Sequence, residues 1–146
     1  HLYTDTMSKT PSFYQGYGLP EIASILQFSD SDQKKLIFFD QDKIAKEGNE
    51  KQYCFQLTNS TEKDVKITLV YTDPPAKPFS AHALVNDLDL VLEANNENLS
   101  VNDRLNNVEQ IHTDLSSFPA KQTFKVRVIG YTIEVQNQTF ALVISG

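Results

Sequence analysis

The sequence predicts a mainly β protein, an antiparallel β-sandwich or jelly roll, with one short helix near its N-terminus. Short stretches whose apolar residues recur with a period of two follow one another from residue 36 to residue 144, with turn-forming residues between them, as in sandwich domains. A long proline-containing loop at 72–86 favours a crossing between sheets or edges, because proline cannot donate to a strand ladder. The 146 residues, 40% of them hydrophobic, suffice for one packed domain.

The alternating stretches give the expected strands. Tyr53–Thr58 and Val65–Tyr71 each place their apolar residues on one face, and the turn residues between them predict that the two form a hairpin. The stretch Ala94–Asn107 is rich in asparagine and is expected to be a loop. The other expected strands are Leu36–Phe39, Leu84–Leu92, Val108–Thr113, Phe124–Val128 and Phe140–Ile144.

The expected helix lies at residues 19–26. Pro20 suits the first turn of a helix and Glu21 favours its positive end. Apolar residues at helical spacing give this segment one apolar stripe, which must pack on another surface because so short a helix is unstable alone. A polar linker, Asp30–Lys35, follows, so we expect a boundary between residues 1–30 and a β-sandwich domain at 31–146.

Charge and composition narrow the classes of partner. The net charge is −6 and the isoelectric point is about 4.9, which argues against binding nucleic acid or an anionic membrane. The sequence has no apolar run long enough to span a bilayer. The single cysteine, Cys54, excludes an internal disulfide and is expected to be a structural thiol.

Paired carboxylates on the expected strand Leu84–Leu92 are the main candidate for chemistry. Asp87 and Asp89 lie on one face of that strand, about 6–7 Å apart at two strand rises. With Asn86 and Asp73 they supply oxygen ligands of the kind that Ca²⁺ prefers, so one prediction is a calcium site.

A second interpretation of the two aspartates stays open. Because the spacing differs from that of an EF-hand loop, Asp87 and Asp89 are also expected to accept backbone N–H groups of the flanking loops, or to pair with Arg104 or Arg127. His82 and His112 are each candidate metal ligands, but no Cys or second His stands at zinc spacing, so both are expected to be ordinary surface or strand histidines.

Three triplets, at Asn59, Asn98 and Asn137, have the Asn-x-Ser/Thr pattern of N-glycosylation acceptors. A chain this rich in Asn, Ser and Thr also produces such triplets by chance. The sequence alone leaves both interpretations open.

Several segments, taken in order, resemble the C-terminal part of subtilisin-like serine proteases. Gly16–Ile22 is similar to the segment that leads into the closing helix of the catalytic domain. Leu69–Ala76 and Leu84–Leu90 resemble two signature segments of an appended β-sandwich, a domain similar in shape to the P domain of proprotein convertases. The segments Asn106–Gln110 and Phe140–Gly146 match the same domain.

This resemblance implies a non-catalytic C-terminal domain of a serine endopeptidase, with residues 1–30 as the end of the catalytic domain. No Gly-Thr-Ser-Met-Ala motif or other triad motif occurs, so no catalytic residue is expected in this chain. The resemblance further implies calcium as the only cofactor, stabilisation of the catalytic domain of the same polypeptide, help in binding protein substrates, and a secreted or vesicular location. The alternative is a free-standing carbohydrate- or protein-binding adhesion module.

Overall fold

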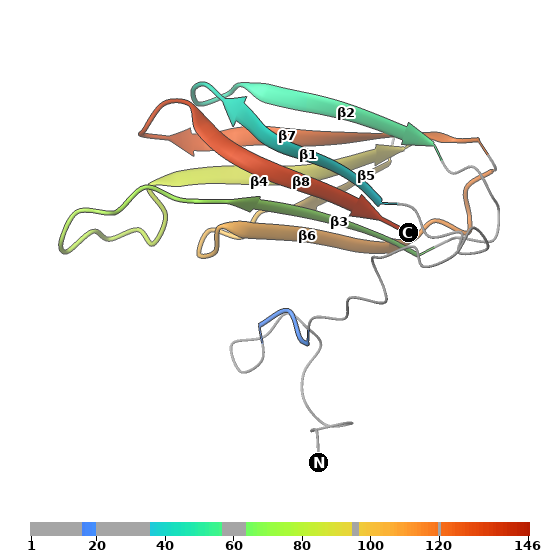
Figure 1. The fold of residues 1–146 in the computed structure, drawn as a ribbon, viewed down its shortest axis with the longest axis horizontal. Helices are drawn as coiled ribbons and strands as arrows, with labels where there is room; N and C mark the ends of the chain where they lie inside the picture. Colours follow the sequence, from blue (N-terminus) through green and yellow to red (C-terminus); the bar gives the residue numbers. More distant parts are fainter. Residues whose placement is uncertain (1–15, 20–35, 57–63, 95–96, 120) are drawn as a thin grey trace, which may run out of the picture.

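The computed structural model describes residues 16–19, 36–56, 64–94, 97–119 and 121–146, and within these ranges the chain forms two packed antiparallel sheets (Figure 1). Each sheet has four strands. The strands are β1 (Leu36–Ile44), β2 (Glu50–Gln56), β3 (Asp64–Tyr71), β4 (Asn86–Ala94), β5 (Glu97–Val101), β6 (Val108–Asp114), β7 (Thr123–Ile133) and β8 (Gln138–Ser145). The mainly β prediction is therefore confirmed.

The order of strands is that of a jelly roll. One sheet runs β1-β8-β3-β6 and the other runs β2-β7-β4-β5. Each strand of the first half of the chain thus pairs with a strand of the second half: β1 with β8, β2 with β7, β3 with β6 and β4 with β5. Such a wrapped ribbon leaves four edge strands, namely β1, β6, β2 and β5.

The core lies between the two sheets and follows the period of two seen in the sequence. Along β4, Leu88 and Leu90 are fully buried, and β4 lies inside its sheet, between β7 and β5. On β3 the inward positions from Val65 to Tyr71 alternate with less buried ones. Tyr53 and Phe55 of β2 also point inward, as predicted, since an antiparallel sheet covered on one face buries every second residue.

The predicted hairpin of the second and third strands is wrong. β2 pairs with β7 and β3 pairs with β6 and β8, so β2 and β3 belong to different sheets. Two strands that face each other across a sandwich core show the same alternation as two neighbours in one sheet. Periodicity alone therefore could not distinguish the two arrangements.

The predicted loop at Ala94–Asn107 contains a strand. β5 pairs with β4 from Leu90 to Ala94, although four of its five residues are exposed. β5 is an edge strand that is held to β4 by backbone hydrogen bonds and not by buried side chains. Its sequence therefore shows no apolar face. The expected helix at 19–26 lies outside the described residues from position 20 onward. Among the residues that the structure describes, no helix has the length and apolar character needed to cross a membrane.

Candidate functional site

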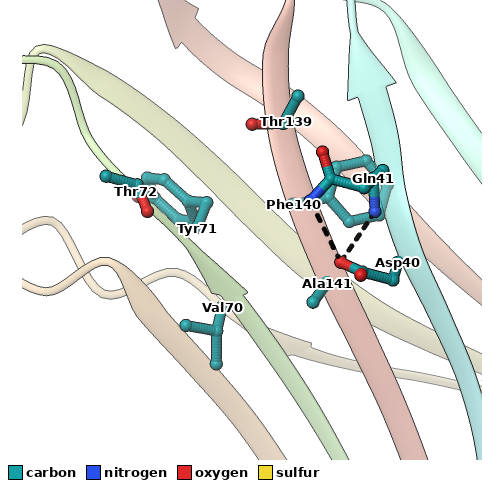
Figure 2. A pocket seen from close by; sticks show the side chains of 8 residues that line it. All are labelled: Asp40, Gln41, Val70, Tyr71, Thr72, Thr139, Phe140 and Ala141. Carbon is teal, nitrogen blue, oxygen red and sulfur yellow. Dashed lines mark hydrogen bonds between the residues drawn. The ribbon is translucent and has the colours of Figure 1, made fainter.

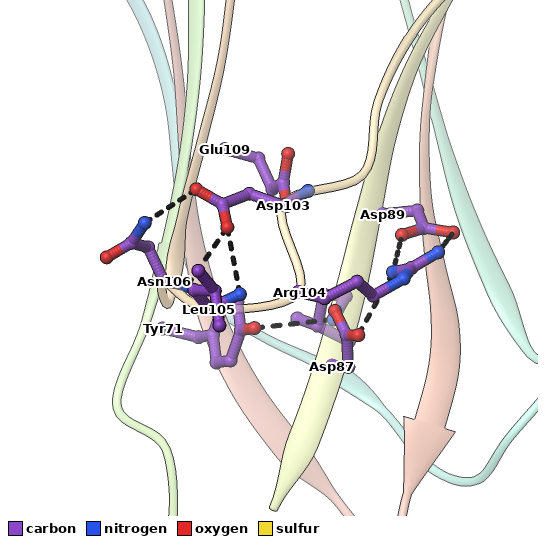
Figure 3. Close-up of polar contacts among 9 residues, drawn as sticks. Tyr71, Asp87, Asp89, Asp103, Arg104, Leu105, Asn106 and Glu109 are labelled. Atoms are coloured by element: carbon purple, nitrogen blue, oxygen red, sulfur yellow. Dashed lines mark hydrogen bonds and ion pairs between the residues drawn. The ribbon is translucent and has the colours of Figure 1, made fainter. Parts of the chain in front are cut away.

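Arg104 is the centre of a charged cluster beside β4. It belongs to the β5–β6 loop, residues 102–107, and its Nη1 donates to Oδ2 of Asp87 at 3.0 Å and to Asp89 (Figure 3). The guanidinium also lies 3.6 Å from the ring centroid of Tyr131, within the range of a cation–π contact. The two carboxylates raise the pKa of Arg104, so the predicted aspartate pair is held by a permanently charged group.

Glu109 is a buried acid on the neighbouring sheet. It is fully buried on β6, where Oε1 accepts the backbone N–H of Asp103 at 2.8 Å. Burial, reinforced by the negative charges of Asp103, Asp89 and Asp87, raises the pKa of Glu109 to about 8. Its other oxygen, Oε2, has no hydrogen-bond partner among the described residues. Glu109 is therefore mainly protonated at neutral pH.

The β5–β6 loop joins the two sheets. Arg104 anchors it to β4 of one sheet, while the amide of Asp103 contacts Glu109 of the other. The Asp103 carboxylate accepts the backbone N–H groups of Leu105 and Asn106, which keeps the turn in shape. The aspartates of β4 thus hold a long loop in place, as one of the two sequence interpretations predicted.

The four residues predicted to bind calcium fall into two groups. Asp87 and Asp89 meet on Arg104, whereas Asp73 accepts the backbone N–H groups of Val85 and Asn86 at 2.9 and 2.7 Å. The side-chain amide of Asn86 is bound to Val135 and Gln138 instead. Within the described ranges no cluster of three or more His, Cys, Asp or Glu side chains is arranged to hold a metal ion. A guanidinium fits the observed arrangement better than Ca²⁺ does, and calcium binding stays a prediction.

Asn86 begins β4 in a buried hydrogen-bond network. Its Nδ2 donates to the carbonyl oxygen of Val135, in the turn between β7 and β8, and to Oε1 of Gln138, the first residue of β8. Its Oδ1 accepts the N–H of Val135 in return. Every polar atom of this amide is satisfied, so Asn86 connects β4 with the β7–β8 turn and has a structural role.

A cavity of about 680 Å³ opens next to the charged cluster. Its size lies within the usual range for small-molecule sites. Charged or polar side chains at its margin, those of Lys77, His82 and Glu134, make no ion pair with other described residues. The lining residues are Pro75, Lys77, Ser80, His82, Leu84, Val85, Asp87, Arg104, Tyr131, Thr132, Glu134 and Val135.

The outward surface of the first sheet carries exposed apolar side chains. We call Leu36, Phe38 and Val70 the outer apolar face. All three side chains are exposed, and 68% of the surface of Phe38 is accessible to solvent. The register places Phe38 beside Val143 of β8, which is partly buried. A strand with one buried face should alternate apolar and polar residues, but Leu36–Phe39 is apolar throughout. This run is the signal in the sequence that could have indicated a second apolar surface.

A smaller hollow of about 180 Å³ borders the outer apolar face where β1 bulges (Figure 2). The β1–β8 register shifts between Phe39 and Asp42, and Gln41 has a φ of 60°. Figure 2 shows Asp40 and Gln41 on one side of β8 and Val70 on the other. The bulge interrupts an apolar edge strand and so opposes uncontrolled pairing with another chain.

Comparison with known proteins points to a larger polypeptide. The chain is 30% identical, over 94% of its length, to the serine protease/ABC transporter B family protein tagA of Dictyostelium discoideum. It is related to part of that protein and spans 9% of its length. No family model matches the sequence. A tobacco streak virus coat protein superposes with a TM-score of 0.32 and 10% identity, over 82% of this chain and 91% of the coat protein.

Proposed function

We propose that this chain is a non-catalytic β-sandwich domain of a subtilisin-like serine endopeptidase, and that it stabilises the catalytic domain of the same polypeptide. The observation that carries the proposal is the 30% identity to a serine protease/ABC transporter protein over 94% of the chain. The segment resemblances to subtilases at Gly16–Ile22 and Leu84–Leu90 agree with it. The domain supplies no catalytic group in this proposal.

The outer apolar face is the surface through which it would contact the catalytic domain. Exposed apolar side chains gather there on β1 and β3, and an exposed apolar patch marks an interaction site. Tyr17, which lies in the segment that resembles the end of the catalytic domain, donates to the carbonyl oxygen of Val108 at 3.1 Å. Val108 pairs with Val70, so the preceding chain reaches the same sheet.

A charge placed on this face tests the proposal. In the full polypeptide, Phe38→Asp is expected to lower the temperature at which protease activity is lost, because a carboxylate would be buried at the contact. The matched control is Phe79→Asp, since Phe79 is a fully exposed phenylalanine in the proline-rich loop. Equal inactivation temperatures for the two variants would refute docking through this face.

A free-standing binding module is the second candidate, and the cavity of about 680 Å³ favours it. Lys77 and Glu134 offer opposite charges at its margin, and Tyr131 offers a half-exposed ring, which together suit a carbohydrate or peptide with both donors and acceptors. Tyr131→Ala would then abolish binding of the domain to a glycan or peptide array. No array ligand for the unsubstituted chain would remove this candidate.

A further inference from the structure

Several asparagine side chains in this domain are tied to the fold by hydrogen bonds. Those of Asn86, Asn106 and Asn107 donate through Nδ2 to groups of the fold: to Val135 and Gln138, to Asp103, and to the carbonyl oxygen of Tyr71, respectively. None of these three begins an Asn-x-Ser/Thr triplet. Their amides are needed for the structure and are unavailable for modification.

Asn98 and Asn137 differ from these three. Both are exposed, both begin an Asn-x-Ser/Thr triplet, and the Nδ2 atom of neither donates to another described residue. Asn137 lies in the turn before β8 with a φ of 64°, a left-handed conformation that asparagine tolerates better than most residues. The third triplet, at Asn59, lies outside the described residues. A free, exposed amide is what an N-glycan acceptor requires.

The position of Asn98 on β5 adds a physical reason for a bulky polar group. β5 is an edge strand with four exposed residues, and Glu97 is its only charged residue. β1 is interrupted by a bulge, and Tyr17 contacts β6. A glycan on β5 would block pairing at an edge that has neither of these features.

Asn98 also faces away from the proposed docking surface. It pairs with Glu93 of β4, and directly opposite residues share a face. Glu93 contacts Arg127 and Lys125 on the outside of the second sheet, which is the side of the sandwich opposite to the outer apolar face. A glycan there would leave that face free.

We infer that Asn98 and Asn137 are N-glycan acceptors, and that the glycan at Asn98 shields the β5 edge. In the reaction, the amide nitrogen forms a bond to the anomeric carbon of a lipid diphosphate-linked oligosaccharide. The lipid diphosphate leaves with the bonding electrons, and the amide nitrogen gives up one proton. The inference rests on the secreted or vesicular location that the resemblance to subtilisin-like proteases implies, and so on the proposed function that shares this resemblance.

The test uses the full polypeptide purified from its own cells. Treatment with peptide N-glycosidase in heavy-oxygen water converts each glycosylated asparagine to an isotopically labelled aspartate, which peptide mass spectrometry locates. We expect label at positions 98 and 137. Recovery of either peptide only as unlabelled asparagine overturns the assignment at that position.

Variants that keep the acceptor provide the control. Ser100→Ala and Thr139→Ala destroy the two triplets but leave Asn98 and Asn137 in place. Each substitution is expected to increase the mobility of the protein on a gel by the amount that one glycan accounts for. Asn102→Gln, at an exposed asparagine outside any triplet, should remove none. Unchanged mobility in Ser100→Ala contradicts a glycan at Asn98. The Phe38→Asp comparison has a separate readout, so docking and glycosylation fail independently.

Discussion

Replacing Glu109 by glutamine should remove a pH dependence from the stability of this domain. In an unfolded chain the pKa of a glutamate is 4.5, whereas burial raises that of Glu109 to about 8. The folded state therefore binds this proton more tightly than the unfolded state does. The resulting stability is fully present below pH 4.5, falls as the pH rises through the interval to about 8, and is constant above it.

The magnitude follows from the width of that interval. At about 1.4 kcal/mol per pH unit for one proton, the difference between 4.5 and about 8 corresponds to at most about 5 kcal/mol. Local rearrangement around the buried carboxylate reduces this, so we expect a loss of about 2–4 kcal/mol between pH 5 and pH 8. Glutamine keeps the oxygen that accepts the Asp103 N–H and carries no charge, and its stability should vary little over the same range.

Urea unfolding of the two proteins between about pH 5 and pH 9, with a chelator present, measures this difference. Glu93→Gln is the matched control: ion partners lower the pKa of Glu93, so it titrates below the range and its substitution should leave the slope unchanged. A wild-type stability that stays level or rises between pH 5 and pH 8 would refute the reasoning. So would a slope in Glu109→Gln equal to that of the wild type.

Three further predictions concern packing and ions. Arg104→Ala leaves Asp87 and Asp89 without their cation and should lower the free energy of unfolding in urea by about 2 kcal/mol. The same change in an Asp87→Asn, Asp89→Asn background should lower it much less. Equal losses in the two backgrounds would show that the ion pairs contribute nothing. Gly130→Ala places a Cβ 2.6 Å from Ile44 Cγ2 and should lower stability by about 2 kcal/mol; an unchanged thermal midpoint would contradict this close contact. If calcium binds as the sequence predicted, excess calcium raises the thermal midpoint relative to chelator; identical melts remove calcium from the account.

The sequence predicted the parts of the fold that depend on local alternation. Leu88 and Leu90 are buried where the period of two places them, and the exposed Cys54 lies between two inward aromatic residues. The pairing of β2 with β7 was not predicted, because strand partners distant in sequence leave no local signal. β5 was missed for a different reason: its exposed residues carry no apolar face.

The candidate site was predicted in part. Arg104 was one of two arginines considered for the aspartates; Arg127 contacts Glu50 and Glu93 instead. The burial of Glu109 could have been predicted from the sequence, since Glu109 stands two residues before the inward Ile111 on the same strand. The contact between Arg104 and Tyr131 could not have been predicted. It joins a loop to a strand 27 positions later, and only the fold brings the two together.

Cross-linking from position 38 tests the central claim most directly. A photoreactive phenylalanine analogue in place of Phe38, in the full polypeptide, would report what covers the outer apolar face, and the same analogue at Phe79 provides the background. Our account predicts cross-links from position 38, and not from position 79, to a subtilisin-like catalytic domain of the same polypeptide. Cross-links to solvent-exposed segments at both positions alike, or to no protease domain, would contradict it.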